Sequence, residues 1–235
     1  MELADYTFKT EKDFSLEINY DLDTELDEDD SFKKGPCYKY FVCLKCHNPE
    51  CLSVNKMLEE EYNWILDPNN PDSRREFERE LCLIKIELSI CKEMTIQSNK
   101  GEEINYKIFL DAFYNNAMKY GKGISYLNPK LKGAGAALFF IILQSAILNK
   151  RINKNDTIVL LASGDLDENE DMRRLVEYYE KLGFEMINPE NLEEDLESVT
   201  MSVPMKGTVE NILNKTMSRF PLVSPEFLNV LKKLV

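Results

Sequence analysis

The strongest constraint on the fold is the regular alternation of strand and helix patterns in the second half of the chain. Strands are predicted at 123–128, 157–163, 184–188 and 199–205, and helices at 134–150 and 169–182. Strands that alternate with helices are typical of layered α/β and α+β folds. With 235 residues, of which 43% are hydrophobic, the chain can bury a large core around such a sheet. We therefore predict an α/β fold, layered in the α+β manner.

The first half of the chain is less regular. Its predicted elements are strands at 7–20 and 37–45, a helix from Ser53 to 66, a buried strand at 81–90 and a helix at 104–120. The last helix is predicted from the spacing of Ile104, Ile108, Ala112 and Phe113. We divide the chain after this helix, into a divergent N-terminal half, residues 1–120, and a core, residues 121–235.

An acidic segment, residues 21–35, lies between the first two predicted strands. It holds six acids from Leu22 to Asp30 and has no apolar periodicity, which predicts a solvated loop. A calcium-binding loop is rejected, because Leu26 occupies the position that needs glycine and Phe32 the position of the closing glutamate.

Charge and hydropathy narrow the choice of partners. The 42 acidic and 29 basic residues give a net charge of −13, which repels phosphate backbones and anionic membrane surfaces. The longest apolar stretch, 134–148, is shorter than the ~20 residues of a membrane-spanning helix. We predict neither a nucleic acid nor a membrane as partner. The first ten residues lack the basic start and apolar run of a secretory signal, which predicts a cytoplasmic protein.

The six cysteines are expected to be mostly thiols, because no secretory signal is recognised. A group of candidate zinc ligands surrounds the sequence CLKCHNPEC and consists of Cys37, Cys43, Cys46, His47 and Cys51. Its spacing matches no standard zinc finger and a second Cys-x-x-Cys pair is absent, so buried strand thiols are favoured over zinc. Cys82 and Cys91 are expected in the core.

Small residues join the strand at 123–128 to the apolar helix that follows it. The run from Gly133 to Ala137 contains only glycine and alanine. Such a turn lets backbone N–H groups surround an anion at the positive end of a helix. The run matches neither a P-loop nor the three-glycine dinucleotide fingerprint. A close helix packing contact explains the same small residues, and both interpretations stay open.

A second pattern lies at 172–187. Apolar residues recur at helical spacing up to Leu182, and Gly183 ends the helix. Taken by itself this is an ordinary amphipathic helix, in which Tyr178 and Tyr179 are core or boundary aromatics.

In this order and at this separation, the two patterns resemble the GNAT superfamily of acyl-CoA-dependent N-acyltransferases. The residues in the positions of the family's pyrophosphate loop are Pro129, Lys132, Gly133, Gly135 and Ala137. Those in the positions of its later helix are Tyr178, Tyr179, Lys181, Gly183 and Phe184. Lysine at 132 departs from the family's arginine or glutamine. The resemblance covers about 123–205 and implies a central mixed sheet flanked by helices.

The resemblance also implies a site and a reaction. Acetyl-CoA, as co-substrate, would lie in a splayed gap between the strands at 123–128 and 157–163. The implied binding residues are Leu127, near the pantetheine, and for the pyrophosphate Lys132, Gly133, Ala134, Gly135, Ala136 and Ala137. Tyr179 stands where many members place the general acid that protonates the departing thiolate. The reaction would transfer an acetyl or similar acyl group to an amine by direct attack.

The general base and the acceptor are less well defined. The strand at 123–128 holds no acid, and Glu87 and Asp165 are candidates by location alone. Met172 stands where the family has an asparagine. The acidic surface favours a cationic amine acceptor, on a small molecule or a protein. These departures, and the unmatched first half, leave a catalytically inactive GNAT-fold binding or regulatory protein as the alternative.

Overall fold

The computed structural model describes residues 6–10, 14–23, 33–34, 37–46, 52–70, 73–74, 77, 81–97, 103–115, 133–163, 169–193, 202–222 and 225. All structural statements below refer to these residues. The predicted strand at 123–128, and with it Leu127, Pro129 and Lys132, lies outside them.

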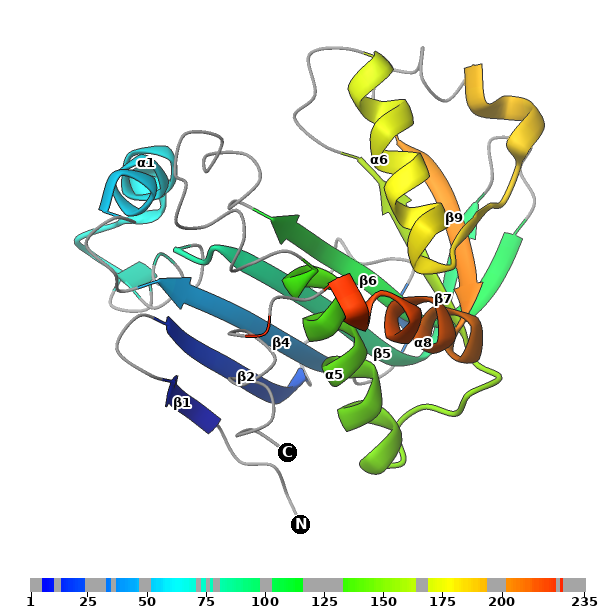
Figure 1. Ribbon diagram of the computed structural model, residues 1–235, viewed down its shortest axis with the longest axis horizontal. Helices are drawn as coiled ribbons and strands as arrows, with labels where there is room; N and C mark the ends of the chain where they lie inside the picture. Colours follow the sequence, from blue (N-terminus) through cyan, green and yellow to red (C-terminus); the bar gives the residue numbers. More distant parts are fainter. Residues whose placement is uncertain are drawn as a thin grey trace.

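The described strands form a single sheet in the order β1-β2-β4-β5-β6-β7-β9-β8, and β3 pairs with β5 (Figure 1). Their bounds are β1 Tyr6–Thr10, β2 Phe14–Asp23, β3 Lys33–Lys34, β4 Cys37–Cys46, β5 Ile84–Gln97, β6 Glu103–Asn115, β7 Thr157–Ala162, β8 Glu185–Met186 and β9 Val203–Thr208. The β6–β7 pairing is parallel and the other described pairings are antiparallel. The sheet is therefore mixed.

Four described α-helices accompany the sheet. Their bounds are α1 Leu52–Tyr62, α5 Ala134–Leu148, α6 Asn169–Leu182 and α8 Val209–Ser218. Short 3₁₀ turns follow at η2 Asn63–Ile65, η4 Pro189–Asn191 and η5 Phe220–Leu222. Among the described elements, α5 lies between β6 and β7 in the sequence and α6 lies between β7 and β8, so strands alternate with helices there. The fold is mixed α/β, as predicted.

One large hydrophobic core lies between the sheet and its helices. Along β5 the residues in this core alternate with residues on the opposite face, and they are Ile84, Ile86, Leu88 and Ile90. This period of two is that of an extended strand. The core also takes in buried side chains of α5, α6 and α8, such as Phe139, Val176 and Ile212. These three helices therefore pack on the same face of the sheet.

The C-terminal end of α5 is anchored to β4 by polar and aromatic contacts. The guanidinium of Arg151 lies over the ring of Tyr38, 3.9 Å from its centroid. The side-chain amide of Asn149 donates a hydrogen bond of 3.5 Å to the hydroxyl oxygen of Tyr40. A cation over an aromatic face is attractive, so these contacts fix one end of the helix across the sheet.

The predicted helix at 104–120 is wrong, because its described part belongs to strand β6. Residues four apart share one face in a strand as well as in a helix, so Ile104 and Ile108 fit both. The register pairs Ile108 with Ile90 and Leu110 with Leu88, and it then shifts by one residue before Ala112 pairs with Glu87. This β-bulge keeps Phe113 on the core side of the strand.

Other boundaries differ less. The strand predicted at 7–20 is two antiparallel strands, β1 and β2, and β2 continues to Asp23 inside the segment predicted as an acidic loop. The buried strand predicted at 81–90 is β5, which begins at Ile84 and runs on to Gln97. The strand predicted at 199–205 is β9, which runs from Val203 to Thr208. The helix α8 that follows it was not predicted.

The expectation that most cysteines are thiols is also wrong. The structure joins Cys37 to Cys91 and Cys43 to Cys82 by disulfides. The first bridge follows from the strand register, because the neighbouring residues Tyr38 and Ile90 pair directly. The second is brought together by a backbone bond of 2.7 Å, donated by the amide of Leu83 to the carbonyl of Leu44. All four cysteines are buried.

Candidate functional site

The N-terminus of α5 is the first part of the candidate site. Gly133 caps the helix in the left-handed conformation, with φ of 74°, and no side chain caps the helix end. The first helical hydrogen bond there runs from the amide of Ala137 to the carbonyl of Gly133. The amides from Ala134 to Ala136 precede it and have no partner within the helix. An anion placed at this end would meet these amides and the positive end of the helix dipole.

Close packing at this helix end leaves little room for a side chain at Gly135. A Cβ added to Gly135 would lie 3.1 Å from Cζ of Phe113 and 3.5 Å from the hydroxyl oxygen of Tyr178. Residues Ala134, Ala136 and Ala137 are buried as well. The close-packing interpretation of the small residues is therefore supported, and the Gly135 Cβ position points at protein atoms.

Phe113 is the residue that brings the two motif segments together. Its ring lies 5.7 Å from that of Tyr178 and 6.3 Å from that of Tyr179, measured between centroids, and 5.8 Å from that of Phe139 on α5. Phe184, which follows α6, stacks on Phe139 at 6.2 Å. Aromatic pairs at these separations contribute beyond the area that they bury. This aromatic cluster, defined as Phe113, Phe139, Tyr178, Tyr179 and Phe184, fixes α5 and α6 on β6.

Gly183 ends α6 as the sequence predicts. Its φ is 104°, a conformation that favours glycine. The side-chain amide of Asn211 on α8 donates a 2.7 Å hydrogen bond to the backbone carbonyl of Gly183. The glycine that the resemblance shares with the family therefore joins α6 to α8.

Tyr179, the predicted catalytic residue, is buried in this cluster with 7% of its surface exposed. Its pKa is raised above the usual value of 10.0, first by burial and then by the hydroxyls of Tyr178 and Tyr114. Burial also raises the pKa of Tyr178, although the charge of Arg219 opposes the shift. Both hydroxyls are therefore neutral at physiological pH and available as donors.

The edge between β6 and β7 is the second part of the candidate site. Their parallel register comprises two pairs, Ile108 with Ile158 and Phe109 with Val159. The described pairs end at Phe109 and Val159. The sequence had assigned this role to 123–128, whereas the described parallel neighbour of β7 is β6.

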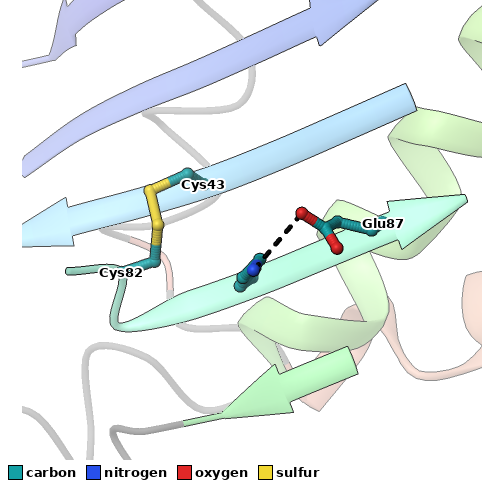
Figure 2. The surroundings of a disulfide bond; sticks show 4 residues. Cys43, Cys82 and Glu87 are labelled. Atoms are coloured by element: carbon teal, nitrogen blue, oxygen red, sulfur yellow. Dashed lines mark ion pairs between the residues drawn. A yellow bond between two sulfur atoms is a disulfide. The ribbon is translucent and has the colours of Figure 1, made fainter. Parts of the chain in front are cut away.

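Glu87 lies on the face of the sheet opposite α5 (Figure 2). Its carboxylate forms an ion pair of 3.3 Å with Lys85, whose side chain is 8% exposed, against 36% for that of Glu87. Its register partner on β6 is Ala112, beside the bulge. Glu87 therefore lies on the strand next to β6. The other candidate base, Asp165, is outside the described residues.

The candidate zinc ligands are not brought together in the described part of the chain. Cys37 and Cys43 are committed to disulfides, and Figure 2 shows the bridge of Cys43 beside Glu87. The side chains of Cys46, His47 and Cys51 are outside the described residues. Among the described side chains, no group of three or more potential metal ligands is found.

Sequence reasoning missed Phe113 as the centre of the site, because it assigned this residue to a helix. A partial signal was present, because Ile104, Tyr106 and Ile108 alternate with polar residues as in a strand. Phe109 then breaks this alternation. Met172, noted as a departure from the family, is fully buried in the main core.

Comparisons with protein-family models, with curated proteins and with solved structures find no match to this chain. Within the described residues, none of the helices has the length and apolar character needed to cross a membrane.

Proposed function

We propose that this protein is an N-acyltransferase with a GNAT-like fold, which transfers an acetyl or similar acyl group from acyl-CoA to an amine. One observation carries the proposal. The two segments on which the resemblance rests are separated by about forty residues in the sequence, and they meet in the aromatic cluster. Tyr178 approaches the glycine of the loop segment, and Tyr179 lies against the same Phe113 ring. This contact agrees with the arrangement that the resemblance implies.

The parallel pairing of β6 with β7 supports the same proposal. The resemblance implies a pantetheine arm between two such strands, and its phosphates would extend toward the start of α5. In the reaction, the amine nitrogen attacks the thioester carbonyl, a C–N bond forms and the C–S bond breaks. Tyr179 donates a hydrogen bond to the departing sulfur, and the amine proton passes to a base. Glu87 is the described candidate for this base, but it lies on the opposite face of the sheet from Tyr179, so the proton would reach it only through a relay of water.

The acceptor that we propose is a cationic amine. The net charge of −13 attracts cations to the protein. We also propose the cytoplasmic location that the sequence predicts. The two disulfides oppose this proposal, because disulfides are rare in the cytoplasm, and their state in the cell tests it.

The alternative is a GNAT-fold protein without catalysis, which uses the same surfaces to bind a partner. It is favoured by the burial of Tyr179 at 7% exposure and by the ion pair that holds Glu87. The two proposals differ in turnover and agree in fold.

Calorimetric titration with acetyl-CoA and with CoA tests the proposed function. We expect both to bind in the micromolar range, and acetyl-CoA then to be consumed in the presence of a polyamine or an amino sugar. Binding without turnover of any amine would favour the non-catalytic alternative. Absence of binding by either compound would contradict the cofactor site.

Replacing Gly135 separates the two explanations of the small residues. We expect Gly135→Ala to lower the free energy of unfolding by about 1–3 kcal/mol through overpacking against Phe113, and to weaken CoA binding as Tyr178 is displaced. Adding Phe113→Leu should restore both quantities, because it removes the atoms that the new Cβ meets. CoA affinity that stays low while stability recovers would show that Gly135 faces the ligand instead. Phe113→Leu alone is the control.

A further inference from the structure

The helix α1 and the turn η2 present two opposite faces. Leu58 is fully buried in the main core and Tyr62 packs against it, so this side fastens the helix to the protein. Met57 and Trp64 lie on the other side, with 48% and 79% of their surfaces exposed. Trp64 is the single tryptophan of the chain.

The exposed residues form a stripe. Met57, Glu60 and Trp64 are three and four residues apart, which places them on one helical face. Glu59 beside this stripe and Asp67 beyond it are exposed as well. We call Met57, Glu59, Glu60, Trp64 and Asp67 the α1 stripe. It combines two large apolar side chains with three carboxylates, and the exposed Lys56 lies one turn before Glu60, which leaves the surface acidic by two charges.

An exposed tryptophan is unusual, because tryptophan is highly buried on average and is enriched at the centres of interfaces. Carboxylates around it select the partner. Each can pair with a lysine or arginine, and the indole face attracts a cation directly. An anionic lipid surface or a second copy of this chain, with its net charge of −13, would be repelled.

We propose that the α1 stripe docks a basic segment of a partner protein, in which lysines or arginines alternate with apolar residues. The apolar side chains of that segment cover Trp64 and Met57, while its cations pair with Glu59, Glu60 and Asp67. The stripe is made of residues that the proposed acyl-transfer site does not use, so its role stands or falls independently of that function.

Tryptophan fluorescence provides a direct test, because any change in emission reports on Trp64 alone. The probe is a short synthetic peptide of alternating lysine and leucine, titrated into the full chain. We expect a blue shift of the emission as the indole is covered. Two matched peptides, one with glutamate for lysine and one with serine for leucine, should produce no shift.

Variants locate the peptide on the surface. Calorimetry should show that Trp64→Ala weakens peptide binding about tenfold or more, and that the double change Glu59→Lys with Glu60→Lys abolishes it. Because these side chains are exposed, the fold should be unaffected, which circular dichroism checks. Leu148→Ala and Glu180→Lys change an exposed apolar residue and an exposed acid elsewhere, and should leave the affinity unchanged.

Several results would overturn the proposal. These are an unchanged Trp64 emission, equal binding of the acidic peptide, or full affinity in Trp64→Ala. A blue shift on phosphatidylserine vesicles without peptide would assign the stripe to a membrane. A shift that depends on protein concentration, with dimers in sedimentation, would assign it to a second copy of the chain.

Discussion

Removing both disulfides should lower the free energy of unfolding by about 7 kcal/mol, which is enough to unfold many domains of this size. The bridges are nested, because Cys43 and Cys82 both lie between Cys37 and Cys91 in the sequence. With the outer bridge closed, the inner bridge adds a loop of only about 15 residues, worth about 3 kcal/mol. The outer bridge alone closes a much longer loop, which is worth about 4 kcal/mol.

The measurement is urea unfolding of the oxidised protein and of the variants. Cys43→Ala with Cys82→Ala should cost about 3 kcal/mol while the other bridge remains. A reductant supplies a matched control, since it should destabilise the wild type strongly and leave a variant lacking all four cysteines unchanged. If the reductant does not affect the wild type, the cysteines are thiols in the protein and the pairing is wrong.

The same chemistry tests the cytoplasmic location. Disulfides persist in oxidising compartments and are rare where glutathione keeps thiols reduced. Alkylation of thiols at the moment of cell lysis records the state in the cell. Four blocked thiols at Cys37, Cys43, Cys82 and Cys91 would agree with the cytoplasm. Two intact bridges would contradict that proposal and place the folded protein in an oxidising compartment.

Three elements of the second half were predicted closely from the sequence. The helices α5 and α6 were placed within one or two residues, and β7 within one. The strand β6 was not predictable in the same way, since apolar residues four apart fit a helix and a strand equally. Its bulge between Leu110 and Ala112 also breaks the alternation at the point where a period would have decided between them.

The disulfides were beyond the sequence for a different reason. The sequence pattern of a strand does not determine its register with the neighbouring strand. Which cysteines lie opposite each other is known only once that register is known. Only once Tyr38 pairs with Ile90 do Cys37 and Cys91 become neighbours. The aromatic cluster has the same origin, because Phe113 reaches Tyr178 through the placement of β6 beside α5 and not through any local pattern.

Tyr179→Phe should lower kcat by about 10²-fold, if the protein has the proposed activity. The change removes one hydroxyl and keeps the ring that packs against Phe113 and Phe184, so stability and CoA affinity should be nearly unaffected. An ordinary thiol has a pKa of about 8.5. Because the pKa of Tyr179 is raised above 10.0, a departing thiolate cannot take its proton fully. Tyr179 therefore acts by donating a hydrogen bond to the sulfur. The loss of one such hydrogen bond is the reason for the expected decrease of kcat by about 10²-fold.

Tyr178→Phe is the matched control, because Tyr178 is adjacent, faces the same Phe113 ring and has a raised pKa of similar cause. It should leave kcat within a few-fold of the wild type, and an equal loss in both variants would remove Tyr179 from the mechanism.

The pH profile gives a second readout. A buried neutral tyrosine stabilises the fold below pH 10 and loses this contribution as pH rises through its raised pKa. The kcat should therefore not fall through ionisation of Tyr179 as the pH is raised to 10. A catalytic tyrosine with a lowered pKa would instead make kcat fall below pH 10.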